Sequence, residues 1–230
     1  MAKNEKANEV LVKRLRDIAN HYEMHVGQTT LKDVIKLLSG YDVVPYDSKN
    51  EDDVEILEKL KKVAQTTVEV IQNVKIKAAR PNEAGNMIEP YVIDALNKVG
   101  YNAHVPEMAN GGRKAVGYPD IAFTDDNGKL NYVECKTYNS HNINTTLRSF
   151  YLSPSDDFKI TCDAHHFIIS FEFDVVSGNK VEGMNVYITK GWMILDAANL
   201  PVELKTEFNS NNRLLYGENH ELILAKDSNI

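Results

Sequence analysis

Apolar positions recur with two different periods along this chain, and the change of period separates a helical first part from a strand-rich second part. Before Pro81 the apolar residues repeat at helical spacing, whereas after Gly100 they alternate with polar residues. Helices are expected at 10–19, at 31–38 between a Thr29-Thr30 cap and Gly40, at 54–71, and from about residue 83 to Lys98 with Gly100 as the stop.

Period-two stretches predict the strands of a sheet in the second part. They cover residues 101–108, 120–124, 130–138, 167–176 and 185–194, and a further helix is expected at 145–152. This order predicts an α/β (α+β) fold in which a central mixed sheet is flanked by helices. We expect two regions, an N-terminal helical region at 1–78 and a core domain at 79–230 that carries the sheet.

Composition and charge exclude few classes of protein. The 230 residues are 43% apolar, which is enough for a core, and no apolar run is long enough to span a membrane. No signal peptide is visible, so a cytoplasmic protein is expected, and Cys135 and Cys162 lack zinc-ligand spacing. The net charge of −7 does not decide about nucleic acid, because charges beyond a Debye length of about 8 Å are screened.

Candidate chemistry lies on two neighbouring predicted strands. Pro119-Asp120 opens one strand, and Glu134-Cys135-Lys136 lies within the next. Side chains alternate along a strand, so Glu134 and Lys136 share one face and Cys135 points to the other. Two carboxylates about 4 Å apart repel by about 4 kcal/mol at an effective dielectric of 20, which a bound cation would relieve. The pattern therefore predicts a Mg²⁺ site suited to phosphodiester hydrolysis, with Lys136 beside the developing charge.

Two other interpretations of charged residues remain open. Glu134 and Lys136 are also consistent with an exposed ion pair on an edge strand. His165-His166, which precedes a strand, is either a metal or general-base site or a pair of structural histidines.

The turn between the two strands decides whether Asp120 and Glu134 share a face. A two-residue Asn127-Gly128 loop would place them on opposite faces, because a slip of one residue reverses every side chain. A three-residue loop with left-handed Gly128 would pair residue 125 with residue 129 and set Asp120 opposite Glu134. Because the chemistry requires a shared face, we predict the three-residue loop with positive φ at Gly128.

The spacing Asp120…Glu134-x-Lys136 resembles the PD-(D/E)xK nuclease motif. Gly85-x-x-x-Glu89, on the helix before it, is similar to the Gly…Glu helix of many such nucleases and archaeal junction resolvases. The chain also resembles the NgoPII-like type II restriction endonucleases. This second likeness runs from about Lys75 to the C-terminus and is carried by residues 80–83, 134–137, 148–158 and 163–167.

The resemblance implies a restriction-endonuclease-like fold and a type II restriction endonuclease that depends on Mg²⁺, with Mn²⁺ able to substitute. The catalytic residues it implies are Asp120, Glu134, Lys136 and Glu89, with Glu83 as the alternative helix carboxylate. The metal ligands it implies are Asp120, Glu134, Glu89 and the backbone carbonyl of Cys135.

The substrate implied is double-stranded DNA with a short, G/C-rich palindromic site, cut to 5′-phosphate and 3′-hydroxyl ends. A palindromic site favours a homodimer. A DNA methyltransferase is expected to be encoded nearby, but it is not expected to bind this protein. Alternatives are a junction-resolving or repair nuclease of the same fold, or a non-catalytic DNA-binding protein.

Contacts to DNA are predicted in two polar segments, and the N-terminal helices are expected to dimerise or to clamp DNA. The candidate DNA-binding residues are Arg113 and Lys114 in the Gly-rich loop, and Asn139, His141, Asn142, Asn144, Thr145 and Arg148 after the Glu-x-Lys strand. Arg reads guanine, Asn reads adenine, and Ser or Thr often hold phosphates.

Overall fold

A computed structural model describes residues 13, 29–112, 117–145, 150, 152, 158–176, 181 and 183–203. The chain divides into two compact units, Thr30–Pro201 and a second unit made of the two terminal segments, Met1–Thr29 and Val202–Ile230. The helices are α2 (Leu31–Ser39), α3 (Glu51–Val74), α4 (Pro81–Asn86), α5 (Glu89–Lys98) and the 3₁₀-helix η1 (Ser140–Asn142). The predicted helix at 10–19 lies outside the described residues apart from Lys13.

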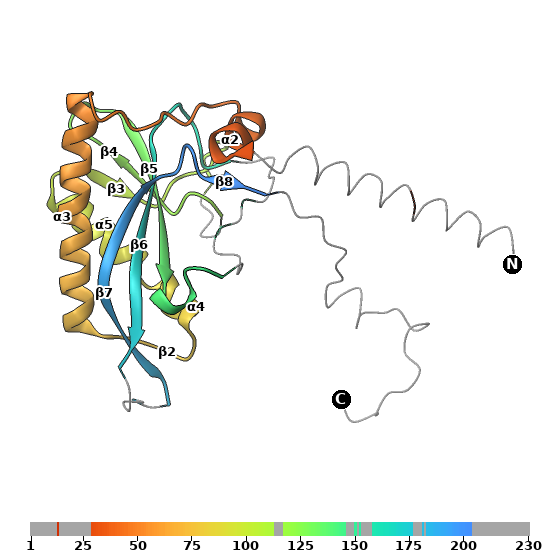
Figure 1. The fold of residues 1–230 in the computed structure, drawn as a ribbon. Coiled ribbons are helices and arrows are strands. Elements are labelled where there is room, and N and C mark those ends of the chain that lie inside the picture. Colours follow the sequence, from red (N-terminus) through yellow and green to blue (C-terminus); the bar gives the residue numbers. More distant parts are fainter. Residues whose placement is uncertain are drawn as a thin grey trace, which may run out of the picture. The chain divides into compact units, whose positions relative to one another are not determined.

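A six-stranded mixed sheet forms the centre of the larger unit (Figure 1). Its strands are β2 (Ile76–Ala78), β3 (Asn102–His104), β4 (Ile121–Thr124), β5 (Leu130–Tyr138), β6 (His166–Val175) and β7 (Asn185–Asp196). Their order is β2-β7-β6-β5-β4-β3, with β5 and β6 parallel and every other neighbouring pair antiparallel. Two short strands, β1 (Thr29–Thr30) and β8 (Pro201–Val202), form a separate sheet.

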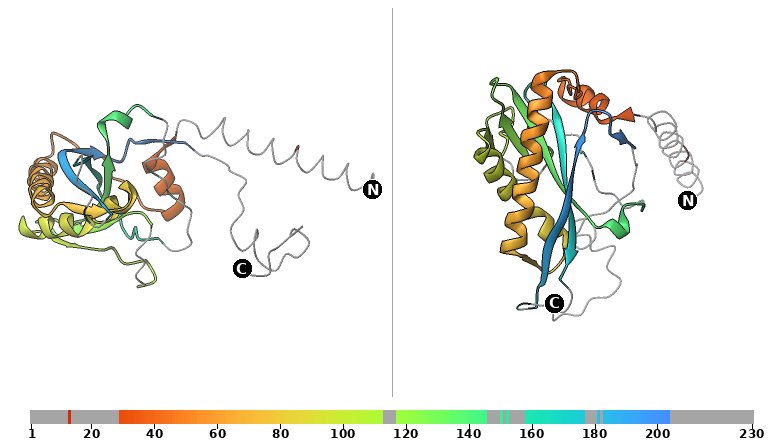
Figure 2. Two further views of the ribbon diagram at one scale, coloured as in Figure 1. Left: turned by 90° about the horizontal axis from the view of Figure 1, so that it is seen from below. Right: turned by 60° about the vertical axis from the view of Figure 1, so that its left-hand side comes forward.

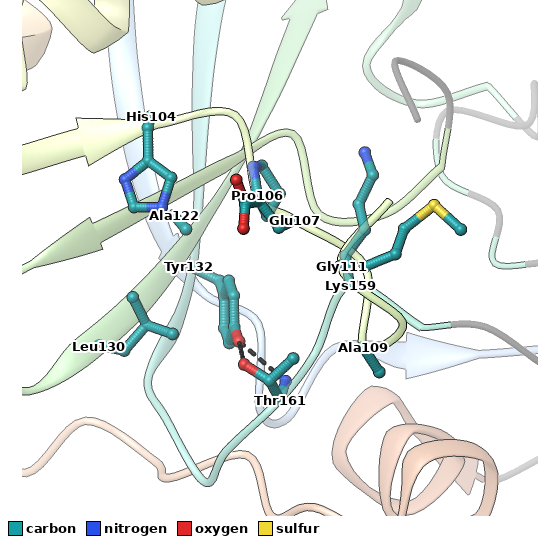
Figure 3. Close-up of a pocket in the computed structure, with 11 residues that line it drawn as sticks. His104, Pro106, Glu107, Ala109, Gly111, Ala122, Leu130, Tyr132, Lys159 and Thr161 are labelled. Carbon is teal, nitrogen blue, oxygen red and sulfur yellow. Dashed lines mark hydrogen bonds between the residues drawn. The ribbon is translucent and has the colours of Figure 1, made fainter. Parts of the chain in front are cut away.

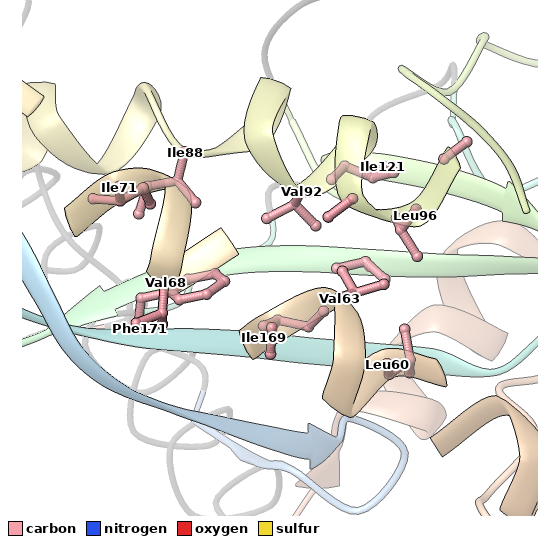
Figure 4. Packing of buried hydrophobic residues seen from close by; sticks show 14 of the residues in the cluster. Leu60, Val63, Val68, Ile71, Ile88, Val92, Leu96, Ile121, Ile169 and Phe171 are labelled. Atoms are coloured by element: carbon pink, nitrogen blue, oxygen red, sulfur yellow. The ribbon is translucent and has the colours of Figure 1, made fainter. Parts of the chain in front are cut away.

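The hydrophobic core lies between one face of the sheet and helices α3 and α5 (Figures 2 and 4). Alternate residues of the central strands point into it, among them Ile121 and Phe123 of β4, Val133 of β5, and Ile169 of β6. The long helix α3 contributes a stripe that includes Leu60 and Ile71. We call this side the helix face, and the side to which the intervening residues point the open face.

The sheet flanked by helices is confirmed, and several predicted boundaries hold. Helix α2 begins after Thr30 and ends at Gly40 in the left-handed conformation, as its sequence predicts. The structure adds a capping box between Thr30 and Asp33. Helix α2 lies on the opposite side of the sheet from α3 (Figures 1 and 2). Among the described residues, β5 has the predicted bounds, and β6 and β7 are within two residues of theirs.

The single helix predicted up to Lys98 is wrong, because the structure has two helices there. Pro81 and Pro90 each occupy the first turn of a helix, the position where the missing N–H of proline costs nothing. A continuous helix would place Pro90 in its interior, where the ring clashes with the preceding turn. A new helix therefore begins at Glu89.

One strand prediction needs correction, and one strand was not predicted. The strand predicted at 101–108 ends at His104, shortly before Pro106, which cannot donate to a ladder. The edge strand β2 was not predicted, because three residues are too short to show a period. Strand β2 pairs with β7, and helix α3 packs in the same core as the strands that follow residue 78. The predicted division at this residue stays a prediction.

Candidate active site

The hairpin between β4 and β5 has the register in which the two motif carboxylates face each other. Ile121 is paired with Val133, and the Asp125 N–H donates to the Lys129 carbonyl at 2.9 Å. The Gly128 N–H donates to the Asp125 carbonyl at 3.0 Å, and Gly128 has a φ of 75°. The predicted three-residue loop is confirmed, and this register continues to place Asp120 opposite Glu134 on the open face.

The ladder between the two strands ends where Pro119 comes opposite Cys135. Pro119 has no N–H, so it cannot donate to the Cys135 carbonyl on the β4 side of β5. The Cys135 N–H instead donates to Asp120 Oδ2 at 2.8 Å, and the Pro119 carbonyl accepts from Lys159 Nζ at 3.2 Å. The proline therefore leaves the Cys135 carbonyl without a donor from β4, and the Asp120 carboxylate binds beside it, next to Glu134.

Glu134 is buried in the middle of β5 with only 6% of its surface exposed. Its Oε1 accepts from Lys136 Nζ at 2.5 Å, whereas its Oε2 has no hydrogen-bond partner among the described residues. Burial and the charge of Asp120 raise the pKa of Glu134 to about 7. The pair is therefore not the exposed edge-strand ion pair considered as an alternative, because β5 is central and Glu134 is desolvated.

Asp120 and Glu89 extend this group of interacting carboxylates. Burial raises the pKa of Asp120, while the Cys135 N–H, Lys136 and Lys159 oppose the rise. Burial, followed by the charge of Asp120, also raises the pKa of Glu89, the first residue of α5. The structure therefore brings Glu89 within electrostatic reach of Asp120. Glu83 instead accepts from the Ala79 N–H at 3.2 Å and forms an ion pair with Arg80.

The close approach of the helices to β5 depends on a glycine. A Cβ added at Gly85 would lie 3.2 Å from Thr137 Oγ1, a contact tighter than ordinary van der Waals packing. Gly85 therefore lets α4 approach β5 on the helix face, just before α5 presents Glu89 to Asp120. This gives the Gly-x-x-x-Glu pattern a packing role that is independent of any resemblance.

The donor set at this place fits a hard divalent cation. Carboxylate oxygens are the ligands that Mg²⁺ prefers, and it commonly takes only one or two of them while keeping several waters. Within the described ranges, no cluster of three or more His, Cys, Asp and Glu side chains is arranged to hold an ion. The fit accordingly rests on Asp120, the unpartnered Oε2 of Glu134 and the neighbouring Cys135 carbonyl.

A cavity of about 390 Å³ lies on the same open face (Figure 3). Ala122 and Tyr132, which are partners in the ladder, contribute to it two residues along their strands from Asp120 and Glu134. Its other walls come from the segment after β3 and from Lys159 and Thr161 before β6. The open face is therefore hollowed, whereas the helix face is filled by the core.

The histidine pair before β6 has structural partners. His165 Nδ1 lies 2.9 Å from the Val44 carbonyl, and its Nε2 lies 3.3 Å from Asp53. His166 is fully buried, its Nδ1 lies 2.6 Å from the Tyr118 hydroxyl, and burial lowers its pKa to about 3. These contacts favour the structural interpretation of both histidines.

Half of the eight predicted DNA-binding residues cannot be compared with the structure. Arg113, Lys114 and Arg148 lie outside the described residues, as does the side chain of Asn142. His141, Asn144 and Thr145 are exposed. Asn139 caps η1 by accepting from the His141 N–H at 2.9 Å, and it donates to the Phe173 carbonyl at 3.4 Å. Its amide is therefore engaged within the protein.

Sequence reasoning missed Lys159, a lysine with 5% of its surface exposed that lies beside the carboxylates. Its Nζ donates to the Gly117 carbonyl at 2.6 Å as well as to that of Pro119. The only local signal is a lysine between two apolar residues, Phe158 and Ile160, in a segment without a clear period.

Comparison with known proteins identifies the family of this chain. The family model described as Type II restriction enzyme MjaV family matches residues 24–219. The chain belongs to this family. A curated relative, the Type II restriction enzyme MjaV of Methanocaldococcus jannaschii, is 40% identical over 197 residues, which cover 79% of this chain and 82% of the relative.

Two negative findings complete the comparison. No solved structure matches this chain. In the part of the chain that the structure describes, no helix is both long and apolar enough to cross a bilayer.

Proposed function

We propose that this member of the type II restriction enzyme MjaV family is an endonuclease that hydrolyses phosphodiester bonds in double-stranded DNA. The observation that carries the proposal is the close approach of the Asp120 and Glu134 carboxylates. Asp120 accepts from the Cys135 N–H, the buried Oε2 of Glu134 has no partner among the described residues, and Lys136 lies beside it. Keeping two carboxylates together in a desolvated place opposes folding unless a cation binds there. On this proposal, Asp120, Glu134 and Lys136 act as the residues of a PD-(D/E)xK nuclease motif.

Asp120, Glu134 and the Cys135 carbonyl would hold Mg²⁺, and Glu89 would bind it directly or through a water. A bound Mg²⁺ polarises the scissile phosphate and lowers the pKa of a bound water. The Cys135 N–H fixes the Asp120 carboxylate, since it donates to Oδ2 at 2.8 Å. Burial of both carboxylates strengthens their attraction for the cation relative to the same groups in bulk water.

Lys136 is placed to stabilise negative charge on the reacting phosphate. Its ammonium contacts Glu134 Oε1 and lies 5.6 Å from the centre of the Phe150 ring, with 29% of its side chain exposed. Substrate would approach from that exposed side. A positive charge fixed where the charge of the phosphate grows lowers the barrier without reorganisation.

The open face is the side on which we place DNA. The carboxylates point to this face, whereas the lysine-rich helix α3 covers the other one. Lys59 of α3 forms ion pairs with Glu55 and Asp126, and Lys61 pairs with Glu58. These two lysines are thus partly neutralised, which makes α3 a poor phosphate-binding surface.

The family supports a site-specific enzyme over the alternatives. A type II enzyme that cuts both strands suits a homodimer on a palindrome, here proposed to be short and G/C-rich, with a methyltransferase encoded nearby. A junction-resolving or repair nuclease of the same fold, and a non-catalytic DNA-binding protein, are the two other candidates. The first would cut branched or damaged DNA, and the second would bind DNA without cutting it.

The deciding experiment is digestion of a sequenced plasmid and of linear duplex, followed by mapping of the ends. With Mg²⁺ or Mn²⁺ we expect discrete fragments whose ends share one short sequence. Lys136→Met should lose this activity, whereas Lys190→Met, a change in an exposed lysine paired with Asp174, should keep it. Cleavage of branched DNA alone would favour a resolvase. Binding without cleavage in either metal would favour a non-catalytic protein.

A further inference from the structure

We propose that Lys159, which lies outside the motif, is a positioning residue for DNA cleavage: it holds the turn of backbone that presents Asp120 to Glu134. The proposal rests on the proposed function. It assigns a role to a buried lysine that the reaction itself does not use.

The first observation is what the ammonium group contacts. Lys159 Nζ donates to the Gly117 carbonyl at 2.6 Å and to the Pro119 carbonyl at 3.2 Å. Gly117 and Pro119 lie three residues and one residue before Asp120, and the pairing of β4 with β5 ends at Ile121, the residue after Asp120. A carbonyl that has lost its ladder partner is thus bound by a charged donor, a stronger hydrogen bond than one between neutral groups.

The second observation is that the lysine itself is held in place. The Phe158 carbonyl accepts from the Ala109 N–H at 2.9 Å, and Ile160 is buried. The Thr161 N–H donates to the Tyr132 hydroxyl at 3.0 Å, and Tyr132 lies two residues before Glu134 on the same face of β5. Lys159 therefore links the Asp120 turn to a segment that is tied to the strand carrying Glu134.

The third observation concerns charge. Lys159 is buried within electrostatic reach of the Asp120 and Glu89 carboxyl groups. Folding alone does not explain the lysine, because a buried charge is often replaced by an apolar side chain of similar size without loss of stability. Its position beside the carboxylates favours a role in setting their geometry.

The test separates positioning from a general structural role and from DNA binding. Three quantities are measured for wild type, Lys159→Met and the surface control Lys190→Met: the melting temperature in EDTA, the Kd for DNA in Ca²⁺, and the single-turnover cleavage rate across a Mg²⁺ series. Lys159→Met should lower the maximal rate about 10- to 100-fold, the range for outer-shell partners of metal sites. It should also raise the Mg²⁺ concentration at half-maximal rate, while the Kd for DNA stays within about twofold.

The proposal is overturned if Lys159→Met cuts within threefold of wild type, or if it loses affinity for DNA while keeping its maximal rate. The second result would make Lys159 a phosphate contact. If the methionine variant lacks a native melting transition, Lys159→Gln, which carries no charge and is too short to span both carbonyls, is judged by the same thresholds. Failure of wild type to cut DNA in any metal would refute the proposed function instead.

Discussion

The buried carboxylate pair makes a prediction about stability that runs against the usual effect of mutating a buried polar residue. Glu134→Gln keeps the shape of the side chain and removes its charge. Burial and Asp120 raise the pKa of Glu134 from 4.5 to about 7. At 1.36 kcal/mol for each pKa unit, the ionised residue costs the folded, metal-free protein about 3 kcal/mol above pH 7.

The free energy of unfolding should decrease with rising pH, because Glu134 binds its proton more tightly in the folded state than in the unfolded chain. Because the pKa is higher in the folded state, the folded protein binds a proton that the unfolded chain has lost between pH 4.5 and about 7, and stability falls as pH rises through this range. In EDTA at pH 8, Glu134→Gln should therefore melt about 6 to 12 °C above wild type, at about 2 to 4 °C per kcal/mol. At pH 5 the difference should shrink to about a quarter.

Thermal melts followed by circular dichroism, in EDTA and in Mg²⁺ from pH 5 to pH 8, measure this difference. Mg²⁺ should raise the melting temperature of wild type more than that of Glu134→Gln, and more at pH 8 than at pH 5. Glu58→Gln, a change in an exposed carboxylate paired with Lys61, is the control and should alter stability by less than about 0.5 kcal/mol. A glutamine variant no more stable than wild type at pH 8, or a gap that grows as pH falls, would refute the reasoning.

Three other perturbations test neighbouring features. Asp120→Asn removes a proposed metal ligand, so it should reduce plasmid cleavage by more than the factor of about 100 that loss of a residue hydrogen-bonded to a ligand can cause. DNA binding in Ca²⁺ should remain. Cleavage at the wild-type rate would show that Asp120 is not part of the site. Gly85→Ala should slow cleavage by up to about tenfold, because the added methyl group pushes α4 away from Thr137. The double variant Gly85→Ala/Thr137→Ala should recover part of the rate. Equal rates for the single and the double variant would contradict the packing role. Gly128→Ala should lower stability by about 1 kcal/mol in urea unfolding because φ is 75°, and Gly128→Asn should lower it less; no loss with alanine would argue against the turn.

The sequence determined those features that depend on neighbouring residues. The capping box and Gly40 set the ends of α2, and the long apolar stripe set α3. The strand β5, with Glu134 and Lys136 on one face, followed from alternation alone. Pro90 also indicates the start of a new helix at α5, although the apolar residues continue at helical spacing across this point.

Tertiary structure decided which residues separated in sequence come together. Local preference allowed two registers for the β4–β5 hairpin, and the packing of Ile121 and Val133 against the helix layer is compatible with only the one that sets Asp120 opposite Glu134. The approach of Glu89 and the contacts of Lys159 depend on segments that meet only when the sheet is complete. Such long-range contacts leave no periodic trace, because periodicity reports which face of an element is buried and not what that face meets.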